Sequence, residues 1–530
     1  MKKEKKMNTK VKSRSRLLLA FLMIVTMLFT GGAWMSFADN GGRMTVKGVE
    51  AGATVKAYKI VKQNNKGQWE PVLNGSINDV TKPTGKEIGK LATRLSELGT
   101  PVDMTVSGKD YTGTGTPGMY LVVVSKTKST YVYNPMVVSV NFDGSGKHDG
   151  GTVDANSKFQ FGPNAYAKRS EPSLDKEITG KENNPQVEND STKHGDTLKP
   201  GDVTSFKITT DVPSYSQVYD NAKLKFEIKD TVSEGLDAPT DIKVADGTKT
   251  LVENTDYELV KSGKSFTVKL KKEYLLSGDS AKKVTVTYKA KLNSNATSGF
   301  DANTNKAEIK YSNSPSTEDD KDKTTYHYTF DIDGDVAGSK NIKGEEIVKV
   351  GVDKTTGELL TKKNITESST VTGKLAGAKF TLYKADASGH KTNTVAGTAT
   401  TDANGLMKFS KLDAGKYVLV ETEAPAGYVL NDKEIPVEIT AKLNAVTGIL
   451  ESYSVKINNE FTSTYKACYD GGTTLKTVDK SGDMTLFNNY KPGLLPTTGG
   501  MGTYLFMIVG GSLIAIAVSL HLKSRRKQEQ

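Results

Sequence analysis

The sequence predicts a mainly β protein made of tandem immunoglobulin-like β-sandwich domains in an elongated array. Val, Thr, Tyr and Ile cluster in short runs, and these residue types favour strands. Several runs alternate apolar and polar residues, as half-buried antiparallel strands do. The length of 530 residues fits roughly three or four domains, and the hydrophobic content of 36% allows packed cores.

The alternation is clearest in the middle of the chain, at a spacing typical of a β-sandwich. The predicted strands there are Leu224–Ile228, Ser265–Leu270, Lys283–Leu292 and Lys306–Tyr311. After them, Ser314–Lys323 is charged and polar, which predicts a connector. Thr84–Leu98 is the one clear helix, because its apolar residues fall on one face.

The chain divides into five predicted segments. They are a signal peptide (1–38), an N-terminal domain (39–168), a middle domain (169–325), a C-terminal domain (326–494) and a terminal anchoring segment (495–530). The first and third domains show internal similarity: Gly118–Val124 resembles Gly415–Glu421, and Ala51–Tyr58 resembles Ala376–Tyr383. This alignment puts Val124 where the third domain has Glu421.

The positive charge of the chain lies at its two ends. Residues 1–38 hold +7 and the last ten residues +3 of the formal +11, which leaves +1 for everything between. A nearly neutral body argues against nucleic-acid binding. Cys468 is the only cysteine, so no intrachain disulfide can form and any covalent stiffening must come from other chemistry.

The N-terminus has the three parts of a secretion signal. A basic region runs to Arg16, an apolar run covers Leu17–Phe29, and the small-x-small site Ser36–Ala38 follows. We expect cleavage between Ala38 and Asp39. The alternative is an uncleaved membrane anchor, but the apolar run is short for a span of about 20 residues.

The C-terminus carries a motif, an apolar run and a basic tail in that order. The motif is Leu495, Pro496, Thr497, Thr498 and Gly499, the predicted transmembrane helix is Tyr504–Leu520, and the tail is Lys523–Lys527. The three together resemble a sortase cell-wall sorting signal; the alternative is a plain single-pass membrane protein. The resemblance implies that a sortase cysteine attacks the Thr498 carbonyl, releases Gly499 onward and passes the acyl group to an amine.

The most specific internal motif runs from Tyr417 to Tyr428 and reads Y-x-L-x-E-T-x-A-P-x-G-Y. It resembles the E-box of Gram-positive pilins, in a domain similar to the B-type repeats of collagen adhesins. In that family a buried Glu, here Glu421, helps to join a Lys to an Asn. Burial can lower a lysine pKa by about 3–5 units, so a neutral amine can attack the amide. A protonated carboxyl then stabilises the charge that develops on the amide oxygen.

The two partners of Glu421 are chosen by strand position. Lys349 lies on an early strand, and Lys354 is the second choice. Asn488 shares one face of the last strand with Met484 and Leu486, and Asn458 is its rival.

The middle domain resembles the middle domain of major pilins, through Ser173–Lys176, the strand that ends at Asp230, and the strand that begins at Asn305. The resemblance implies a bond between Lys176 and Asn305, with Asp230 as the acid. Because Val124 replaces the acid in the first domain, we predict no such bond there.

Family pilins carry a Tyr-Pro-Lys motif just before the middle domain. Ala165–Lys168 occupies that place, with Ala167 where the family has Pro. Lys168 is therefore the predicted lysine that accepts Thr498 of the next subunit, with Lys158 and Lys181 as alternatives.

The remaining signals are weaker. Asp331–Asp335 resembles a calcium loop, but the later ligands are absent and a turn is the preferred interpretation. The histidines show no triad or metal spacing, and we expect no metal and no cofactor; they are His148, His194, His327, His390 and His521.

The sequence therefore predicts a secreted major pilin, a structural protein whose only catalysis is the closure of its own isopeptide bonds. The implied partners are a class C pilus sortase and a housekeeping sortase, other copies of the chain, peptidoglycan, minor pilins and a host matrix or cell surface. The first alternative is a monomeric wall-anchored adhesin that binds host matrix. A surface enzyme is disfavoured, because no nucleophile–base pair is visible.

Overall fold

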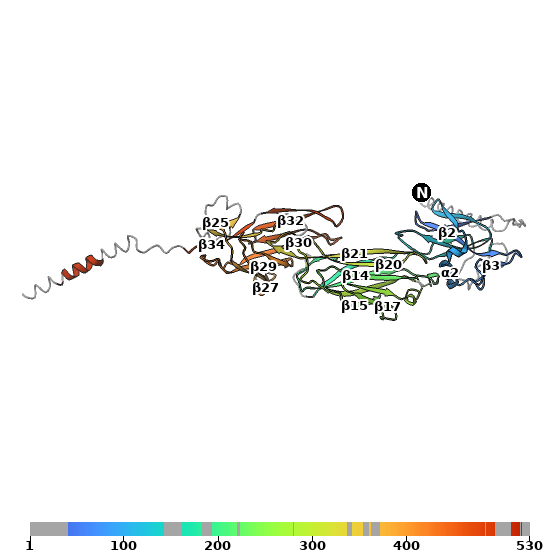
Figure 1. Cartoon of the computed structure of the whole chain (residues 1–530), viewed down its shortest axis with the longest axis horizontal. Helices are drawn as coiled ribbons and strands as arrows, with labels where there is room; N and C mark the ends of the chain where they lie inside the picture. Colours follow the sequence, from blue (N-terminus) through green and yellow to red (C-terminus); the bar gives the residue numbers. More distant parts are fainter. Residues whose placement is uncertain are drawn as a thin grey trace, which may run out of the picture. The chain divides into compact units, whose positions relative to one another are not determined.

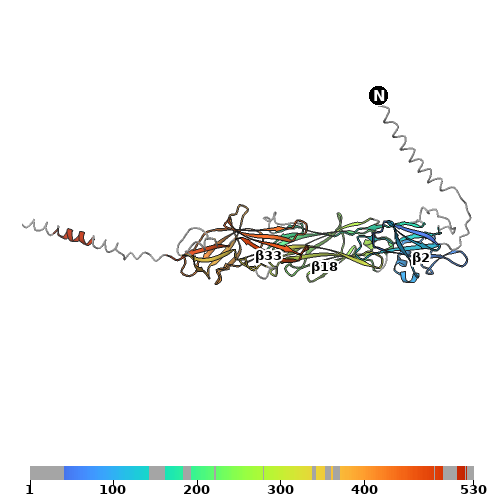
Figure 2. The same cartoon turned by 90° about the horizontal axis from the view of Figure 1, so that it is seen from above.

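The structure is a computed structural model, and it describes residues 41–142, 162–182, 193–219, 223–278, 280–336, 342–352, 360–361, 371–482, 484–492, 510–519 and 521. Strands dominate the described residues in both views (Figure 1, Figure 2), which confirms the predicted mainly β fold. The described chain divides into two compact units. One holds the residues up to 124 and those at 135–167, and the other holds 125–134 and everything from 168 onward.

The first unit is built on one sheet with the strand order β8-β6-β2-β4-β5-β1-β9, and β3 adds to β2. Val46, Ile60, Leu121 and Val138 are among its fully buried core residues. The strands are β1 (Gly42–Lys47), β2 (Thr54–Gln63), β3 (Trp69–Pro71), β4 (Val102–Ser107), β5 (Asp110–Gly115), β6 (Gly118–Ser125), β8 (Met136–Val140) and β9 (Asn164–Tyr166).

The predicted helix over Thr84–Leu98 is present but divided. Thr84 caps the N-terminus of helix α2 (Gly85–Ala92), and its side chain forms a capping box with that of Glu87. The helix ends at Thr93, whose hydroxyl donates to the Lys90 carbonyl, and a 3₁₀ helix, η1 (Leu95–Leu98), follows. A β-branched residue that bonds back to the preceding turn explains the break.

The second unit begins with a sandwich of two sheets that enclose one hydrophobic core, with Phe206, Ile228 and Val286 at its centre. The five-stranded sheet consists of β11 (Asp175–Lys181), β13 (Val203–Val212), β19 (Lys282–Lys291), β15 (Thr240–Asp246) and β16 (Lys249–Thr250). The six-stranded sheet consists of β12 (Gly195–Thr197), β21 (Glu318–Tyr328), β20 (Asn303–Ser312), β14 (Phe226–Val232), β18 (Ser265–Leu270) and β17 (Tyr257–Ser262). Four of these strands match the four predicted from alternation. The short elements β7 (Val132–Tyr133), β10 (Arg169–Ser170), η2 (Gln217–Tyr219) and α3 (Lys272–Leu275) complete this part.

The prediction of a connector at Ser314–Lys323 is wrong, because β21 (Glu318–Tyr328) occupies most of it. The strand pairs with β20 from Glu318 to His327. Acidic residues on β21 face lysines on β20, with 3.6 Å between Lys306 Nζ and Asp322 Oδ2 and 3.2 Å between Lys310 Nζ and Glu318 Oε2. Cross-strand charge pairs stabilise a strand that has almost no apolar alternation to predict it.

A second sandwich follows in the same unit. Its four-stranded sheet consists of β24 (Leu360–Thr361), β34 (Thr485–Tyr490), β23 (Ile347–Val352) and β25 (Val371–Lys374). Its seven-stranded sheet consists of β27 (Lys391–Thr400), β26 (Lys379–Ala385), β29 (Gly415–Glu423), β30 (Ile435–Leu443), β31 (Leu450–Ile457), β32 (Phe461–Tyr469) and β33 (Leu475–Gly482). The strands β22 (Phe330–Ile332) and β28 (Phe409–Leu412) pair beside them.

The two sandwiches of the second unit are joined through strand β21, which crosses the predicted boundary between residues 325 and 326. Tyr328 at its end packs into the core of the second sandwich, and its hydroxyl accepts the Leu450 backbone N–H at 3.1 Å. Gly195 on β12 and Gly448 in the loop between β30 and β31 meet backbone to backbone, so closely that a Cβ at either one would clash with the backbone of the other segment.

Three predicted terminal segments lie outside the described residues: the signal peptide, the motif at residues 495–499 and the basic tail. Residues 510–519 are helical, but no helix in the described part of the chain is long and apolar enough to cross a membrane. The predicted transmembrane helix over Tyr504–Leu520 is therefore not supported.

Candidate functional sites: two buried lysine–acid–asparagine clusters

The first cluster lies inside the first sandwich of the second unit and brings together Lys176, Asp230 and Asn305. The Lys176 Nζ donates to Asp230 Oδ2 at 2.5 Å and to Asn305 Oδ1 at 2.5 Å. All three side chains are fully buried. Residues separated by as many as 129 positions in the sequence therefore meet at one amine.

The pairing of the strands explains this meeting. Lys176 lies on β11 of the five-stranded sheet and points inward. Asp230 on β14 and Asn305 on β20 belong to neighbouring strands of the six-stranded sheet, where Val232 is opposite Asn305. Because side chains alternate along a strand, Asp230 and Asn305 point to the same inner face as diagonal neighbours.

An aromatic residue that the sequence analysis did not single out completes this cluster. The Tyr288 hydroxyl donates to Asp230 Oδ2 at 2.8 Å and accepts from Asn305 Nδ2 at 3.0 Å. Phe206 stacks on the Tyr288 ring at 5.2 Å, and the Lys176 Nζ lies 5.5 Å from the Phe206 ring centre. The only signal in the sequence is a tyrosine at a buried position of a strand, where a hydroxyl needs a partner.

Burial sets the protonation of the first cluster. It lowers the pKa of Lys176 to about 8, against the opposing attraction of Asp230. Burial also raises the pKa of Asp230, against the opposing charge of Lys176. The two shifts bring the pKa of the amine and the pKa of the acid closer together. The proton can therefore pass from Lys176 to Asp230, which leaves a neutral amine beside an amide.

The second cluster lies in the second sandwich and contains Lys349 and Glu421. The Lys349 Nζ is 3.1 Å from Glu421 Oε1, and both side chains are buried. Glu421 Oε2 accepts the Asn431 backbone N–H at 2.9 Å and the side-chain amide of Asn489 at 2.9 Å. Burial lowers the pKa of Lys349 to about 8, against the opposing attraction of Glu421.

The strand register places Asn489, and not the predicted Asn488, beside Lys349 and Glu421. Strands β23 and β34 are parallel, with Lys349 opposite Phe487 and Val350 opposite Asn488. Asn489 therefore shares the face of Lys349, whereas Asn488 shares the opposite face with Val350. The face of Met484 and Leu486, which suggested Asn488, packs on the separate cluster of Val348 and Val350.

The other candidates for this cluster are placed elsewhere. Asn458 lies in the turn between β31 and β32, with a left-handed φ of 53°, and its backbone N–H donates to the Pro436 carbonyl. Lys354 lies outside the described residues.

The candidate linking lysine, Lys168, is exposed between β9 and β10, and its carbonyl accepts the Asn134 backbone N–H. Among the alternatives, Lys181 donates to the Thr197 carbonyl and Lys158 lies outside the described residues. Val124 is buried in the sheet of the first unit.

The segment Asp331–Asp335 contains a buried carboxylate, that of Asp333, which forms a cluster of hydrogen bonds. The Asp333 carboxylate accepts backbone N–H groups of Glu346, Ile347 and Met407 at 2.7, 3.0 and 3.1 Å. Burial and the neighbouring Glu346 charge hold the pKa of Asp333 well above its usual range. Within the described residues, no group of three or more His, Cys, Asp or Glu side chains could hold a metal ion.

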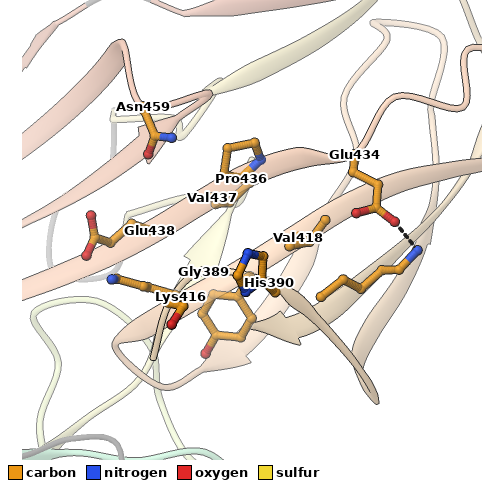
Figure 3. A pocket seen from close by; sticks show the side chains of 12 residues that line it. Gly389, His390, Lys416, Val418, Glu434, Pro436, Val437, Glu438 and Asn459 are labelled. Carbon is orange, nitrogen blue, oxygen red and sulfur yellow. Dashed lines mark ion pairs between the residues drawn. The ribbon is translucent and has the colours of Figure 1, made fainter. Parts of the chain in front are cut away.

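A pocket of about 550 Å³ opens on the second sandwich (Figure 3). Its lining includes the Lys391–Glu434 ion pair. It contains no predicted crosslink residue, although Tyr417, the first residue of the E-box-like motif, reaches it. Its lining consists of Ser388, Gly389, His390, Lys391, Lys416, Tyr417, Val418, Glu434, Pro436, Val437, Glu438 and Asn459.

Four family models match successive parts of the chain. They describe a T6 antigen Ig-like domain (residues 39–169), an Sgo0707 N2 domain (182–324), a SpaA prealbumin-like fold domain (361–451) and an LPXTG cell wall anchor motif (488–529). The β-rich modules and the anchor motif together define a modular surface protein that is anchored to the cell wall.

The trypsin-resistant surface T6 protein of Streptococcus pyogenes serotype M6 is 25% identical to the chain, over 96% of the chain and 99% of the relative. The chain is a homologue of that protein. The solved structure of the T6 backbone pilin of serotype M6 is described as a modular three-domain structure. It is similar with a TM-score of 0.57 and 22% identity, over 86% of this chain and 99% of that one, and this likeness supports the fold.

Proposed function

We propose that the chain is the backbone subunit of a covalently polymerised pilus. A sortase joins Thr498 of one copy to a lysine of the next, and the finished fibre is anchored to peptidoglycan, where it supports adhesion. The observation that carries this proposal is the homology to the T6 surface protein along 96% of the chain, together with the anchor motif at residues 488–529.

The fibre is stiffened by two internal amide bonds, Lys176–Asn305 and Lys349–Asn489. In each, the neutral lysine amine attacks the Cγ of the asparagine, the new N–C bond forms, and the old C–N bond breaks to release ammonia. Asp230 or Glu421 takes the proton of the lysine and delivers it to the leaving nitrogen. The short contacts of each buried lysine with its acid, and the asparagine beside that acid, support this chemistry.

The bonds would close loops of 129 and 140 residues, from the positions of their ends. Treated like disulfides, such crosslinks remove about 4–5 kcal/mol of unfolded-chain entropy each. They also tie an early strand of each sandwich to a late one, so a pull on the chain ends cannot unzip the loop between them. This suits a protein without disulfides that transmits force along a fibre.

The lysine that accepts Thr498 is Lys168, because it is exposed and lies immediately before the middle domain. The test is the SDS-resistant ladder of polymers in cell-wall extracts. We expect Lys168→Ala to abolish the ladder, while the matched variants Lys158→Ala and Lys181→Ala keep it. A ladder that survives in Lys168→Ala assigns the link to another lysine. Single chains alone in cells with the unaltered protein would favour the monomeric adhesin.

A further inference from the structure

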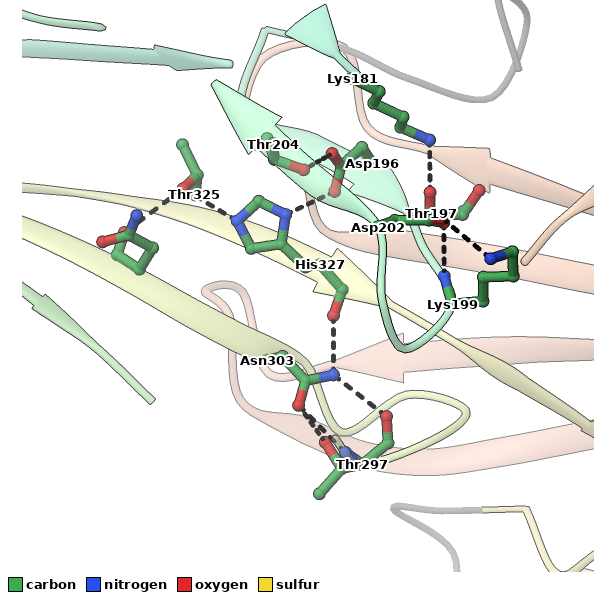
Figure 4. Close-up of polar contacts among 11 residues, drawn as sticks. Lys181, Asp196, Thr197, Lys199, Asp202, Thr204, Thr297, Asn303, Thr325 and His327 are labelled. Carbon is green, nitrogen blue, oxygen red and sulfur yellow. Dashed lines mark hydrogen bonds and ion pairs between the residues drawn. The ribbon is translucent and has the colours of Figure 1, made fainter. Parts of the chain in front are cut away.

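A second buried polar cluster lies beside the Lys176 site (Figure 4). The His327 Nδ1–H on β21 donates to the Asp196 carboxylate on β12 at 2.5 Å, and both side chains are fully buried. The Thr204 hydroxyl is 3.5 Å from the other Asp196 oxygen. The chemistry proposed above uses neither residue, and the pairing is not visible in the sequence because 131 residues separate the two.

This pair is connected to the reacting asparagine through Thr325. Thr325 on β21 is directly opposite Asn305 on β20. Its hydroxyl lies 3.4 Å from His327 Nε2 and 3.4 Å from the Asn305 backbone oxygen. Figure 4 shows the imidazole between Thr325 on one side and Asp196 on the other.

Strand β20 is also held by hydrogen bonds at Asn303, two residues before Asn305. The Asn303 side-chain amide donates to the His327 carbonyl at 3.2 Å, and its Oδ1 accepts the Thr297 backbone N–H at 3.0 Å. The His327 backbone carbonyl therefore contacts β20 at position 303, and the His327 ring is linked to position 305 through Thr325.

A third contact joins the pair to the lysine. The His327 ring stands edge-on to Phe206 at 5.3 Å. The same Phe206 ring stacks on Tyr288, and the Lys176 Nζ lies 5.5 Å from its centre. One aromatic side chain thus separates the imidazole from the amine, and His327 touches none of the reacting atoms.

A fully buried polar pair is a poor way to stabilise a core, because apolar residues of similar volume would usually do as well or better. The directional hydrogen bond between Asp196 and His327 can instead fix the position of β12 relative to β21. β12 is a three-residue edge strand, and Asp196 and His327 are opposite each other in its parallel pairing with β21. Reactions between bound groups are sensitive to displacements of about 1 Å, which makes such fixing useful beside a bond-forming site.

We propose that His327 and Asp196 are positioning residues for the Lys176–Asn305 crosslink. They hold β21, and through Thr325 the Asn305 backbone, so that the amide carbon stays within reach of the amine. The inference rests on the proposed function, since it presupposes that this bond forms. Bond formation and ammonia release occur at Lys176 and Asn305, and the pair exchanges no atoms with them.

The test follows crosslink formation in the full mature chain carrying Lys349→Arg, so that only the first cluster can react. The chain is made by cell-free synthesis, aliquots are quenched in acidic denaturant, and intact mass reports the loss of about 17 Da as ammonia leaves. We expect His327→Gln and Asp196→Ala to slow the loss about tenfold or more. Asp196→Asn, which keeps an acceptor oxygen, should restore the rate to within about twofold.

Two further variants separate positioning from general stability. Val268→Ala, at a fully buried position on β18, lowers the thermal midpoint without touching the pair and should leave the rate near that of the parent. Thr325→Val keeps the shape of the side chain and should slow the reaction several-fold, because it removes the hydroxyl link.

The proposal is overturned if His327→Gln or Thr325→Val reacts at the parental rate. It is also overturned if Val268→Ala slows the reaction as much as His327→Gln at an equal drop in thermal midpoint. A parent that never loses ammonia rejects the crosslink itself, which is visible before any variant is compared.

Discussion

The two buried clusters use the same three groups in different arrangements. In the first, the acid and the asparagine are neighbours in the six-stranded sheet, and Lys176 comes from the facing five-stranded sheet. In the second, Lys349 and Asn489 are on neighbouring parallel strands of one sheet, and Glu421 comes from the facing seven-stranded sheet. The first bond would therefore tie two sheets together, and the second would tie two adjacent strands.

In both clusters the acid meets its lysine across the gap between two sheets, so this gap alone does not explain the choice of acid. The clusters differ in where the acid lies relative to the asparagine. Asp230 lies diagonally across from Asn305 on the next strand of the same sheet. Glu421 reaches Asn489 as well as Lys349 from the facing sheet, and its additional methylene adds length for that reach. The supporting groups differ as well: a tyrosine hydroxyl bridges the first cluster, whereas a backbone N–H and the asparagine amide hold the second carboxylate.

The largest expected effect separates Asn489 from Asn488. Asn489→Ala should abolish the second crosslink, so the chain keeps about 17 Da that the parent loses. Its second sandwich should melt about 10 °C or more below that of the parent, because about 4–5 kcal/mol of loop entropy returns to the unfolded state. Asn488→Ala is the matched control and should keep the crosslink. Intact mass of the two variants decides, and loss of the bond in Asn488→Ala alone would reverse the assignment.

Replacing the acid of each cluster with the acid type of the other should slow crosslinking in both clusters. Asp230→Glu and Glu421→Asp each move a carboxyl by about one methylene, and we expect each to slow its own bond about a hundredfold. Each variant leaves the other cluster unaltered, and that cluster serves as an internal control. Peptide mapping of timed samples measures both rates, and equal rates in parent and swapped chains would show that acid length is unimportant.

The pH dependence should be shared by the two clusters. In the proposed reaction each lysine attacks as the neutral amine, after its proton has passed to the carboxylate beside it. Because the pKa of both Lys176 and Lys349 is lowered to about 8, the last proton of each pair leaves above that pH. Crosslinking should then fall about tenfold per pH unit between pH 8 and 10. Rates that rise through this range would mean that a free amine reacts without its acid.

The smallest expected effect belongs to Tyr288. Tyr288→Phe removes the hydroxyl that bridges Asp230 and Asn305, and the first bond should form roughly threefold to fivefold more slowly, by loss of about one hydrogen bond. Among the described residues no tyrosine hydroxyl bridges the acid and the asparagine of the second cluster, so the second bond should keep its rate. Mass analysis of the crosslinked peptides in one sample gives the rates at which the two bonds form. An equal slowing of both bonds would point to a general loss of stability.

Much of this arrangement could be read from local patterns. Alternating residues predicted four strands of the first sandwich to within a few positions. The order of Lys176, Asp230 and Asn305 along the chain predicted three residues that the fold brings within hydrogen-bonding distance. The motif around Glu421 likewise led to Lys349. These features are encoded by neighbours in the sequence, or by a spacing that resembles known families.

Long-range pairing decided the rest. A strand pattern shows that Asn488 and Asn489 point to opposite faces, but only the parallel register with β23 determines which face meets Lys349. In the same way, the charges of β21 make sense only beside the lysines of β20, and Tyr288, His327 and Asp196 come together only when distant strands pair. The sequence by itself determined which groups are present and in what order. The tertiary structure decided which of them touch, because contacts between sheets depend on registers that no local segment contains.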